Sequence, residues 1–262
     1  MSKFIDISHA DGVATVTLNQ PEKHNAFDDA IIDQLTTAFK KIDADDSVRV
    51  MVLSANGKSF SAGADLAWMK RMAGYTQEEN LNDARALAIM LNTLNSLCKP
   101  TIARVQGAAF GGAVGLVSCC DMAVASERAS FCLSEVRIGL IPATISPYVI
   151  EAIGSRAARR YFMTAERFNA HTARKLGLVS EVTEETKLDS CINDLIKNLL
   201  ANGPRAISEA KRLVADVANA QIDQRLIDET SQRIASIRTS EEGQEGLNAF
   251  LEKRAANWIK HK

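Results

Sequence analysis

The chain has 262 residues, of which 46% are hydrophobic and 24% charged, so it can bury one large core without disulfides or metals. Its 31 basic and 32 acidic residues leave a net charge of −1, which gives no reason to expect a nucleic acid or an anionic membrane as partner. No apolar run reaches membrane-spanning length and no signal peptide is evident, so we expect a cytoplasmic protein without a membrane partner.

The first half of the chain alternates predicted strands and helices. Asp28 is the expected N-cap of a helix with one apolar stripe, and the capping-box pattern from Thr76 to Glu79 begins another. Short apolar runs predict strands at residues 13–18, 48–53, 101–105 and 122–125. This order is typical of an α/β fold with short connections.

The second half is predicted to be mainly helical. A short helix over residues 169–176 ends at Gly177, and Pro204 suits the first position of the next helix. Helices are also expected over residues 221–237 and 240–258. Amphipathic helices in a row at a C-terminus often pack on a neighbouring subunit, which favours an oligomer.

The cysteines and histidines give no sign of a metal site. Five cysteines and four histidines occur at spacings that match no zinc site, so we expect none. Cys119 and Cys120 lie in an apolar run, where buried packing thiols are expected rather than redox-active ones.

Three segments carry candidate chemistry: FSAGADL (residues 60–66), QGAAFGGA (106–113) and FCLSEVRIG (131–139). Glycine allows a tight turn and the close approach of a ligand, and a helix start leaves backbone N–H groups unpaired. Two such turns aimed at one point would form an oxyanion hole, each donor contributing about 3 kcal/mol. Either segment alone also fits an ordinary turn, and the glycines at 107–112 match no nucleotide-binding pattern.

Together the three segments resemble the crotonase family, also called the enoyl-CoA hydratase/isomerase family. The similarity continues at residues 19–26, 173–179 and 245–254, so it spans nearly the whole chain. The resemblance implies an α/β fold with a crotonase-like core of repeated β-β-α units, wound as a spiral, over residues 1–200. A C-terminal helical region, residues 201–262, would serve trimerisation.

The resemblance also implies a substrate and a site. The substrate would be an acyl-CoA thioester, with coenzyme A as part of the substrate and no separate cofactor. Ala64 and Gly112 would supply the oxyanion-hole amides, and Glu135 would be the catalytic glutamate. Residues along the coenzyme A would be Lys23, Ala62, Asp65, Leu66 and Ala67, joined by Phe250 and Lys253 from a neighbouring subunit of a homotrimer or homohexamer.

This sequence departs from the family at two places near the expected double bond. Gly115 stands where hydratases of the family carry a second glutamate, and residues 141–147 replace a glycine-rich stretch. Glu135 would then act alone or with a polar neighbour such as Ser146 or Tyr148. We expect an apolar setting to raise its pKa, provided by Phe131, Leu133, Val136 and Ile138.

Residues 68–72, 79–85 and 131–149 resemble a subgroup, the bacterial 3-methylglutaconyl-CoA hydratases of leucine and isovalerate catabolism. A sister interpretation is hydration of isohexenylglutaconyl-CoA in terpene breakdown. Both substrates carry a distal carboxylate, and either could meet a basic residue. The candidates, each of which also fits a solvated surface cation, are Lys70, Arg71, Arg85 and Arg137.

The leading hypothesis is therefore a lyase that reversibly hydrates a 2-enoyl-CoA. The enzymatic alternative is an isomerase that moves a double bond with one glutamate, which Gly115 favours on chemical grounds. The non-enzymatic alternatives are an RNA-binding protein, suggested by relatives of the eukaryotic 3-methylglutaconyl-CoA hydratase, and an inactive scaffold. Retention of Ala64, Gly112 and Glu135 argues against the scaffold.

Overall fold

The computed structural model describes residues 4–259, and its larger sheet has six strands in the order β1-β2-β3-β5-β7-β10. β1 and β2 form an antiparallel hairpin, and the other neighbours are parallel. The strands are β1 (Ile5–Ala10), β2 (Val13–Leu18), β3 (Val50–Ala55), β5 (Thr101–Val105), β7 (Met122–Ser126) and β10 (Glu181–Thr183). All four predicted strands are present, with β3 beginning two residues later than expected.

A smaller sheet has four strands in the order β4-β6-β8-β9, and only the pair β8–β9 is antiparallel. Its strands are β4 (Ser59–Ser61), β6 (Ala108–Phe110), β8 (Ser130–Cys132) and β9 (Phe168–Asn169). Three times the chain passes from the larger sheet to the smaller one and then into helix: β3–β4–α2, β5–β6–α4 and β7–β8–α5. This repeat is the predicted β-β-α core.

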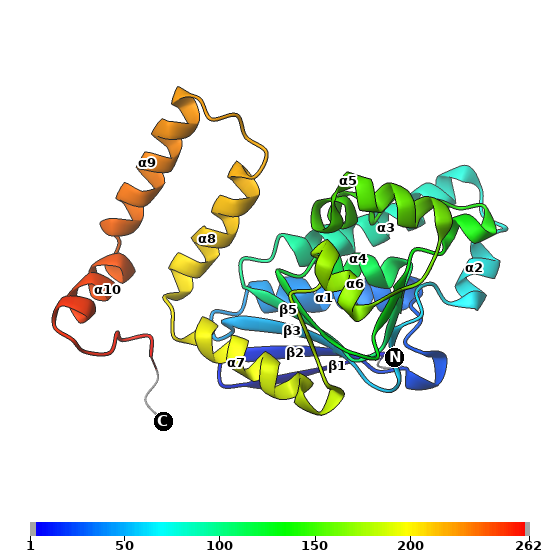
Figure 1. The fold of residues 1–262 in the computed structure, drawn as a ribbon, viewed down its shortest axis with the longest axis horizontal. Coiled ribbons are helices and arrows are strands. Elements are labelled where there is room, and N and C mark those ends of the chain that lie inside the picture. The colour runs from blue at the N-terminus through cyan, green and yellow to red at the C-terminus, as the bar shows by residue number, and fades with distance from the viewer. Residues whose placement is uncertain (1–3, 260–262) are drawn as a thin grey trace.

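The helices of the first 200 residues surround the two sheets (Figure 1). They are α1 (Asp29–Asp43), α2 (Leu66–Met72), α3 (Gln77–Asn95), α4 (Gly112–Ser118), α5 (Ser146–Thr164), α6 (Ala170–Leu176) and α7 (Leu188–Leu200), with single 3-10 turns at η1 (Pro21–Lys23), η2 (Glu135–Ile138) and η3 (Glu185–Lys187). The side chain of Asp28 accepts from Ile31 N–H, and both capping-box bonds between Thr76 and Glu79 are present. The predicted starts of α1 and α3 are therefore confirmed.

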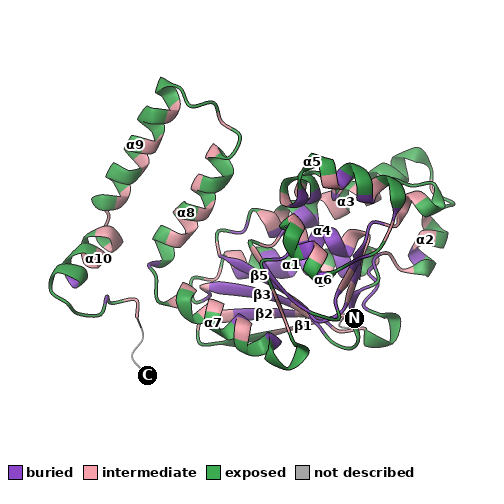
Figure 2. Cartoon of the chain, viewed as in Figure 1, coloured by how far each residue is buried: buried purple, intermediate pink, exposed green. Residues whose placement is uncertain are grey.

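β3 is buried on both faces, because helices cover the larger sheet on each side (Figure 2). Successive side chains of a strand point to opposite faces. Met51 and Leu53 join the main core, whereas Val50 and Val52 pack in a second cluster with Leu188 of α7. Burial on both faces explains why the sequence of β3 is a continuous apolar run rather than an alternating one.

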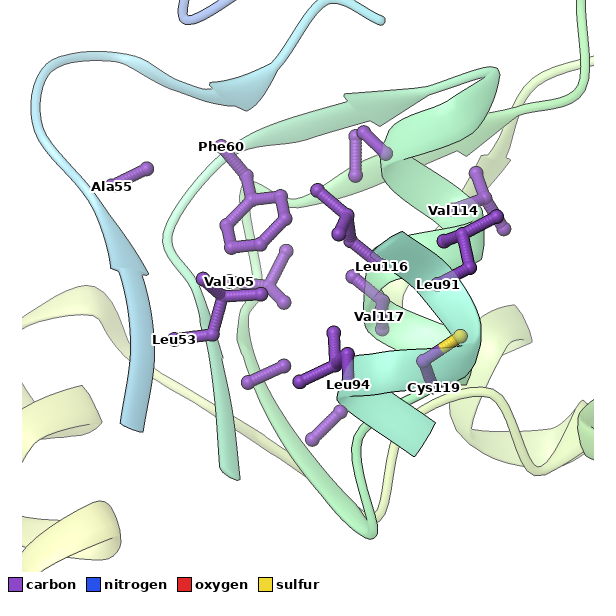
Figure 3. Packing of buried hydrophobic residues seen from close by; sticks show 14 of the residues in the cluster. Leu53, Ala55, Phe60, Leu91, Leu94, Val105, Val114, Leu116, Val117 and Cys119 are labelled. Atoms are coloured by element: carbon purple, nitrogen blue, oxygen red, sulfur yellow. The ribbon is translucent and has the colours of Figure 1, made fainter. Parts of the chain in front are cut away.

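α4 is enclosed by other elements (Figure 3). Val114 and Leu116 are fully buried, as are Leu91 and Leu94 of the facing α3. A helix that is apolar all round suits such a place. Cys119 at its end is 2% exposed, as expected for a packing thiol. No helix in the described range 4–259 combines the length and apolarity needed to cross a bilayer.

The last three helices, α8 (Pro204–Val217), α9 (Gln224–Arg238) and α10 (Glu241–Leu251), extend away from the sheets (Figure 1). The prediction that the final helix continues to residue 258 is wrong. Lys253 adopts a left-handed conformation (φ +56°), and the chain then turns back along α10. Glu245 secures this return, because its carboxylate accepts from Arg254 at 2.7 and 2.8 Å and from Asn257 N–H at 2.8 Å.

Candidate active site

Three parallel strands of the smaller sheet end beside one another. β4 pairs with β6, and β6 pairs with β8. The carboxyl ends of parallel strands lie at one edge of a sheet, so the segments that follow them meet there. These are the three segments singled out in the sequence, and they carry Ala64, Gly112 and Glu135.

The backbone N–H of Ala64 is left without an acceptor by the way its loop pairs with Phe27. Gly63 C=O accepts from Phe27 N–H at 2.8 Å, and Asp65 N–H donates to Phe27 C=O at 3.0 Å. Consecutive peptide groups of an extended segment face opposite sides, so the Ala64 N–H between these bonds faces away from Phe27. Nothing in residues 4–259 accepts it.

The backbone N–H of Gly112, the first residue of α4, is also free of protein acceptors in the described chain. Gly111 before it has a positive φ (+54°) that favours glycine, and it offers no side chain to cap the helix. Gly111 N–H itself is used, because it donates to Cys132 C=O at 2.8 Å. The loop is thereby fixed to β8 while the first amide of the helix stays available.

The three loops touch one another. A Cβ built on Gly63 would lie 2.7 Å from Phe110 C=O and 3.9 Å from Gly111 Cα, so only glycine at position 63 allows this approach. A Cβ built on Gly111 would lie 3.3 Å from Oε1 of Glu135. The carboxyl group of Glu135 therefore stands next to the turn that precedes Gly112.

Glu135, the first residue of η2, is a partly buried acid with an unused oxygen. Its Oε2 atom is buried and has no hydrogen-bond partner within the described residues. Burial raises the pKa of this carboxyl above its ordinary value of 4.5, although its own backbone N–H acts in the opposite direction. The raised pKa is as predicted. Phe131 and Leu133 are fully buried beside it in sequence, whereas Ile138 is 57% exposed.

Gly115 has no room for a side chain. A Cβ there would lie 2.8 Å from Cβ of Ile145 and closer still to its Cγ2. Ile145 is 1% exposed, and Leu91 closes the same space from α3. The two departures from the family pattern, at position 115 and in residues 141–147, are therefore one packing arrangement. Ser146 is engaged elsewhere, since its hydroxyl donates to Ala143 C=O.

The residues expected along the coenzyme A fall into two groups. Lys23 Nζ lies 3.9 Å from Asp65 Oδ2, and Asp65 also caps α2 by accepting from the N–H groups of Ala67 and Trp68. Three exposed positions accompany this ion pair: Ala62 on the loop after β4, and Leu66 and Ala67 at the start of α2.

Phe250 and Lys253 are not brought to this group within one chain. Phe250 lies on α10, at the opposite end of the molecule from α2 (Figure 1), and is 82% exposed. The prediction that the two residues share a helix face is wrong, because α10 ends at Leu251 and Lys253 lies beyond its cap.

The four candidate cations differ in their surroundings. Arg71 is 2.6 Å from Asp29, Arg137 donates to Ala165 C=O at 2.5 Å, and Arg85 lies 3.5 Å from Asn82 Oδ1. Lys70 is exposed and has no partner in the part of the chain that the structure describes. Of the four, Lys70 is thus the one without a hydrogen-bond or ion-pair partner among the described residues, and Arg71 is the one paired with an acid.

Asn25 and Phe27 support the site and were not identified from the sequence. Asn25, 2% exposed, accepts from Gln20 N–H and donates to the carbonyls of Asn56 and Ser59. These bonds hold the segment that carries Phe27, whose ring lies against Gly112. No spacing rule links a residue near position 27 to turns at 63 and 111, so the sequence contained no signal for this role.

Comparison with known proteins agrees with this architecture. The family model described as enoyl-CoA hydratase/isomerase matches residues 8–261. A crystal structure of an enoyl-CoA hydratase from Shewanella pealeana superimposes with a TM-score of 0.95 at 48% identity, covering 98% of this chain and 96% of that one.

Two further relatives cover almost the whole length. Pseudomonas aeruginosa AtuE superimposes with a TM-score of 0.94 at 30% identity over 98% of this chain and all (100%) of that one. The 2,3-dehydroadipyl-CoA hydratase of Escherichia coli is 31% identical over 259 residues, which are 98% of this chain and 99% of that protein. The chain belongs to the enoyl-CoA hydratase/isomerase family, the crotonases.

Proposed function

We propose that this protein reversibly hydrates a 2-enoyl-CoA, with the thioester oxygen held by the N–H groups of Ala64 and Gly112 and the proton carried by Glu135. The observation that supports it most is the buried, unpartnered Oε2 of Glu135 beside the turn that leaves Gly112 N–H free. A site with two unused donors and one unused acid can polarise a thioester and move a proton.

The reaction then needs three events. The two amides donate to the thioester oxygen and stabilise the negative charge that develops on it. Glu135 as a carboxylate takes a proton from water, and the water oxygen bonds to C3 while the C2–C3 π electrons move toward C2 and the thioester. Glu135 then gives the proton to C2 on the same face, so that one water adds across the double bond and the acid returns to its starting form.

One carboxylate performs both transfers in this scheme. Position 115 is a glycine and Ile145 fills the space beside it, so no acid at that position takes part in the proton transfers. A carboxyl whose pKa is raised toward the working pH both accepts and donates a proton at a useful rate.

We infer further that the preferred substrate carries a second carboxylate, as 3-methylglutaconyl-CoA of leucine and isovalerate catabolism does. The sequence resemblance to that subgroup supports this, and the Escherichia coli relative is named for another dicarboxylic thioester. Lys70, exposed and unengaged, is the candidate partner for the distal group. Isohexenylglutaconyl-CoA is the alternative with the same chemistry.

Coenzyme A is proposed to lie along Lys23, Ala62, Asp65, Leu66 and Ala67. Phe250 and Lys253 would reach it from the next subunit of a homotrimer or homohexamer, with residues 201–262 forming the contacts between subunits. The exposed apolar side chains of this region support an assembly, since Val214, Ile222, Phe250 and Leu251 are 65–84% exposed in one chain.

The test is a panel of enoyl-CoA thioesters, comparing kcat/KM for 3-methylglutaconyl-CoA, isohexenylglutaconyl-CoA and crotonyl-CoA. We expect a substrate with a distal carboxylate to exceed crotonyl-CoA by roughly ten- to a hundredfold, the effect of one charge-assisted hydrogen bond. Equal values would refute the distal-carboxylate proposal, and no hydration of any of them would refute hydratase activity.

An isomerase is the second candidate, because a single glutamate suffices to move a proton between C2 and C4 of a 3-enoyl-CoA. The same panel should therefore include a 3-enoyl-CoA. Conversion of that substrate faster than any 2-enoyl-CoA is hydrated would favour the isomerase.

A further inference from the structure

Phe27 is a buried residue that contacts both of the loops carrying the free amides. We propose that it is a positioning residue, which sets the separation between the N–H groups of Ala64 and Gly112. This inference rests on the proposed function, since it concerns the two amides assigned above to the thioester oxygen.

The backbone of Phe27 fixes the first loop. Its N–H and C=O bond to Gly63 and Asp65, the two neighbours of Ala64, at 2.8 and 3.0 Å. A third bond, from Ala62 N–H to His24 C=O at 2.9 Å, continues the pairing. The direction of the Ala64 N–H is therefore dictated by the backbone of residue 27.

The ring of Phe27 fixes the second loop. A Cβ built on Gly112 would lie 2.6 Å from Cζ of Phe27, so the ring edge rests directly against this glycine. The ring has little room to move away from Gly112, because Phe27 is 2% exposed and its ring centroid lies 6.5 Å from that of Trp68. Trp68 in turn is anchored by a 3.0 Å bond from its Nε1 to Asp83.

One residue thus contacts both loops whose donors must reach a single oxygen, the first through its backbone and the second through its ring. Donors of an oxyanion hole act at 2.7–3.1 Å from the charged oxygen, and a misplacement of about 1 Å can lower the rate roughly a hundredfold. A smaller residue at position 27 would keep the backbone bonds to Gly63 and Asp65 but remove the contact with Gly112. The expected defect lies in the reaction step and spares substrate binding.

The first experiment compares Phe27→Leu with Phe39→Leu, the same truncation at a fully buried phenylalanine of α1. We expect Phe27→Leu to lower kcat by roughly tenfold or more with KM changed less than about threefold, and Phe39→Leu to leave both unchanged. Equal losses in the two variants would show a merely structural role and overturn the proposal.

The second measurement detects the hydrogen bonds that the Ala64 and Gly112 N–H groups donate to the thioester carbonyl. In Glu135→Gln, in which turnover should be at least about a hundredfold slower, the infrared band of a thioester carbonyl labelled with ¹³C should move to lower frequency on binding, and adding Phe27→Leu should reduce that shift. No shift in Glu135→Gln itself would refute the oxyanion assignment of the proposed function. A full shift that Phe27→Leu leaves unchanged would refute only the role of Phe27.

A rescue experiment tests the ring contact. Gly112→Ala keeps the N–H but places a Cβ against Cζ of Phe27, so kcat should fall sharply. Leucine has no atom that reaches the position of Cζ, and we expect the Gly112→Ala/Phe27→Leu protein to recover at least roughly tenfold over Gly112→Ala alone. A double variant that only multiplies the two single losses would contradict the proposal.

Discussion

Ile145 occupies the space that any side chain at position 115 would need: a Cβ on Gly115 would lie 2.8 Å from the Cβ of Ile145. The two residues come from α4 and from the N-terminal cap of α5, and they touch although 30 positions separate them. This pair explains how the second acid of the family pattern can be absent at position 115 without leaving a cavity.

Restoring an acid at position 115 should therefore fail unless Ile145 is reduced. We expect Gly115→Glu to lower the free energy of unfolding by roughly 2–4 kcal/mol, from overpacking and a buried charge, and Ile145→Ala in addition to recover part of it. Urea unfolding measures both. Gly74→Glu, at an exposed glycine with space for a Cβ, is the matched control. Similar stability of Gly115→Glu and the parent would contradict the packing account.

The pH dependence of hydration should reflect the raised pKa of Glu135. Hydration needs the carboxylate, so kcat/KM should fall as the pH drops through the pKa of Glu135 in the free enzyme, which burial raises above 4.5. The acid limb of the profile is therefore expected above pH 4.5 and should be absent from the residual rate of Glu135→Gln. A limb at or below pH 4.5 would show that a solvated carboxyl controls the rate.

Lys70→Ala should lower kcat/KM for a substrate with a distal carboxylate by roughly ten- to a hundredfold and leave crotonyl-CoA unaffected. The reason is the loss of one charge-assisted hydrogen bond that only the longer substrate makes. Lys41→Ala, which removes an exposed lysine from α1, controls for net charge. An equal effect of Lys70→Ala on both substrates would exclude a direct contact with the distal group.

Truncation after Gly246 should weaken assembly and coenzyme A binding together, because it removes Phe250 and Lys253 along with the end of α10. Sedimentation velocity and the Kd for coenzyme A provide the two measurements. The single change Phe250→Ser, at a side chain that is 82% exposed in one chain, is expected to raise the Kd with the fold intact. A fully active monomer would be incompatible with a site completed by a neighbour.

Local signals were enough to predict the elements that depend on neighbouring residues. The cap at Asp28, the capping box from Thr76 to Glu79 and the double burial of β3 all follow from short-range pattern. The two- and three-residue strands of the smaller sheet are too short for any periodicity, and tertiary pairing alone forms them. The resemblance to a family indicated them indirectly, through the repeated β-β-α unit.

The remaining differences come from contacts between distant residues. α10 ends early because the chain turns back after Leu251 and Glu245 binds Arg254 and Asn257. The helical pattern of the sequence does not indicate these contacts. The candidates Ala64, Gly112 and Glu135 could be named from motifs, whereas Phe27 and Ile145 act through packing against glycines. A glycine in the sequence can indicate that the space around it is limited, but it does not indicate which side chain fills that space.

Turnover of Glu135→Gln is the most direct test of the central claim, that one carboxyl carries the proton in hydration. The substitution keeps the shape of the side chain and removes the base. We expect kcat for hydration of the best enoyl-CoA to fall at least about a hundredfold while the Kd for coenzyme A stays unchanged, within the usual range for acid–base catalysis of about 10²–10⁴. Near-normal turnover of Glu135→Gln would contradict the account and place the proton on another group.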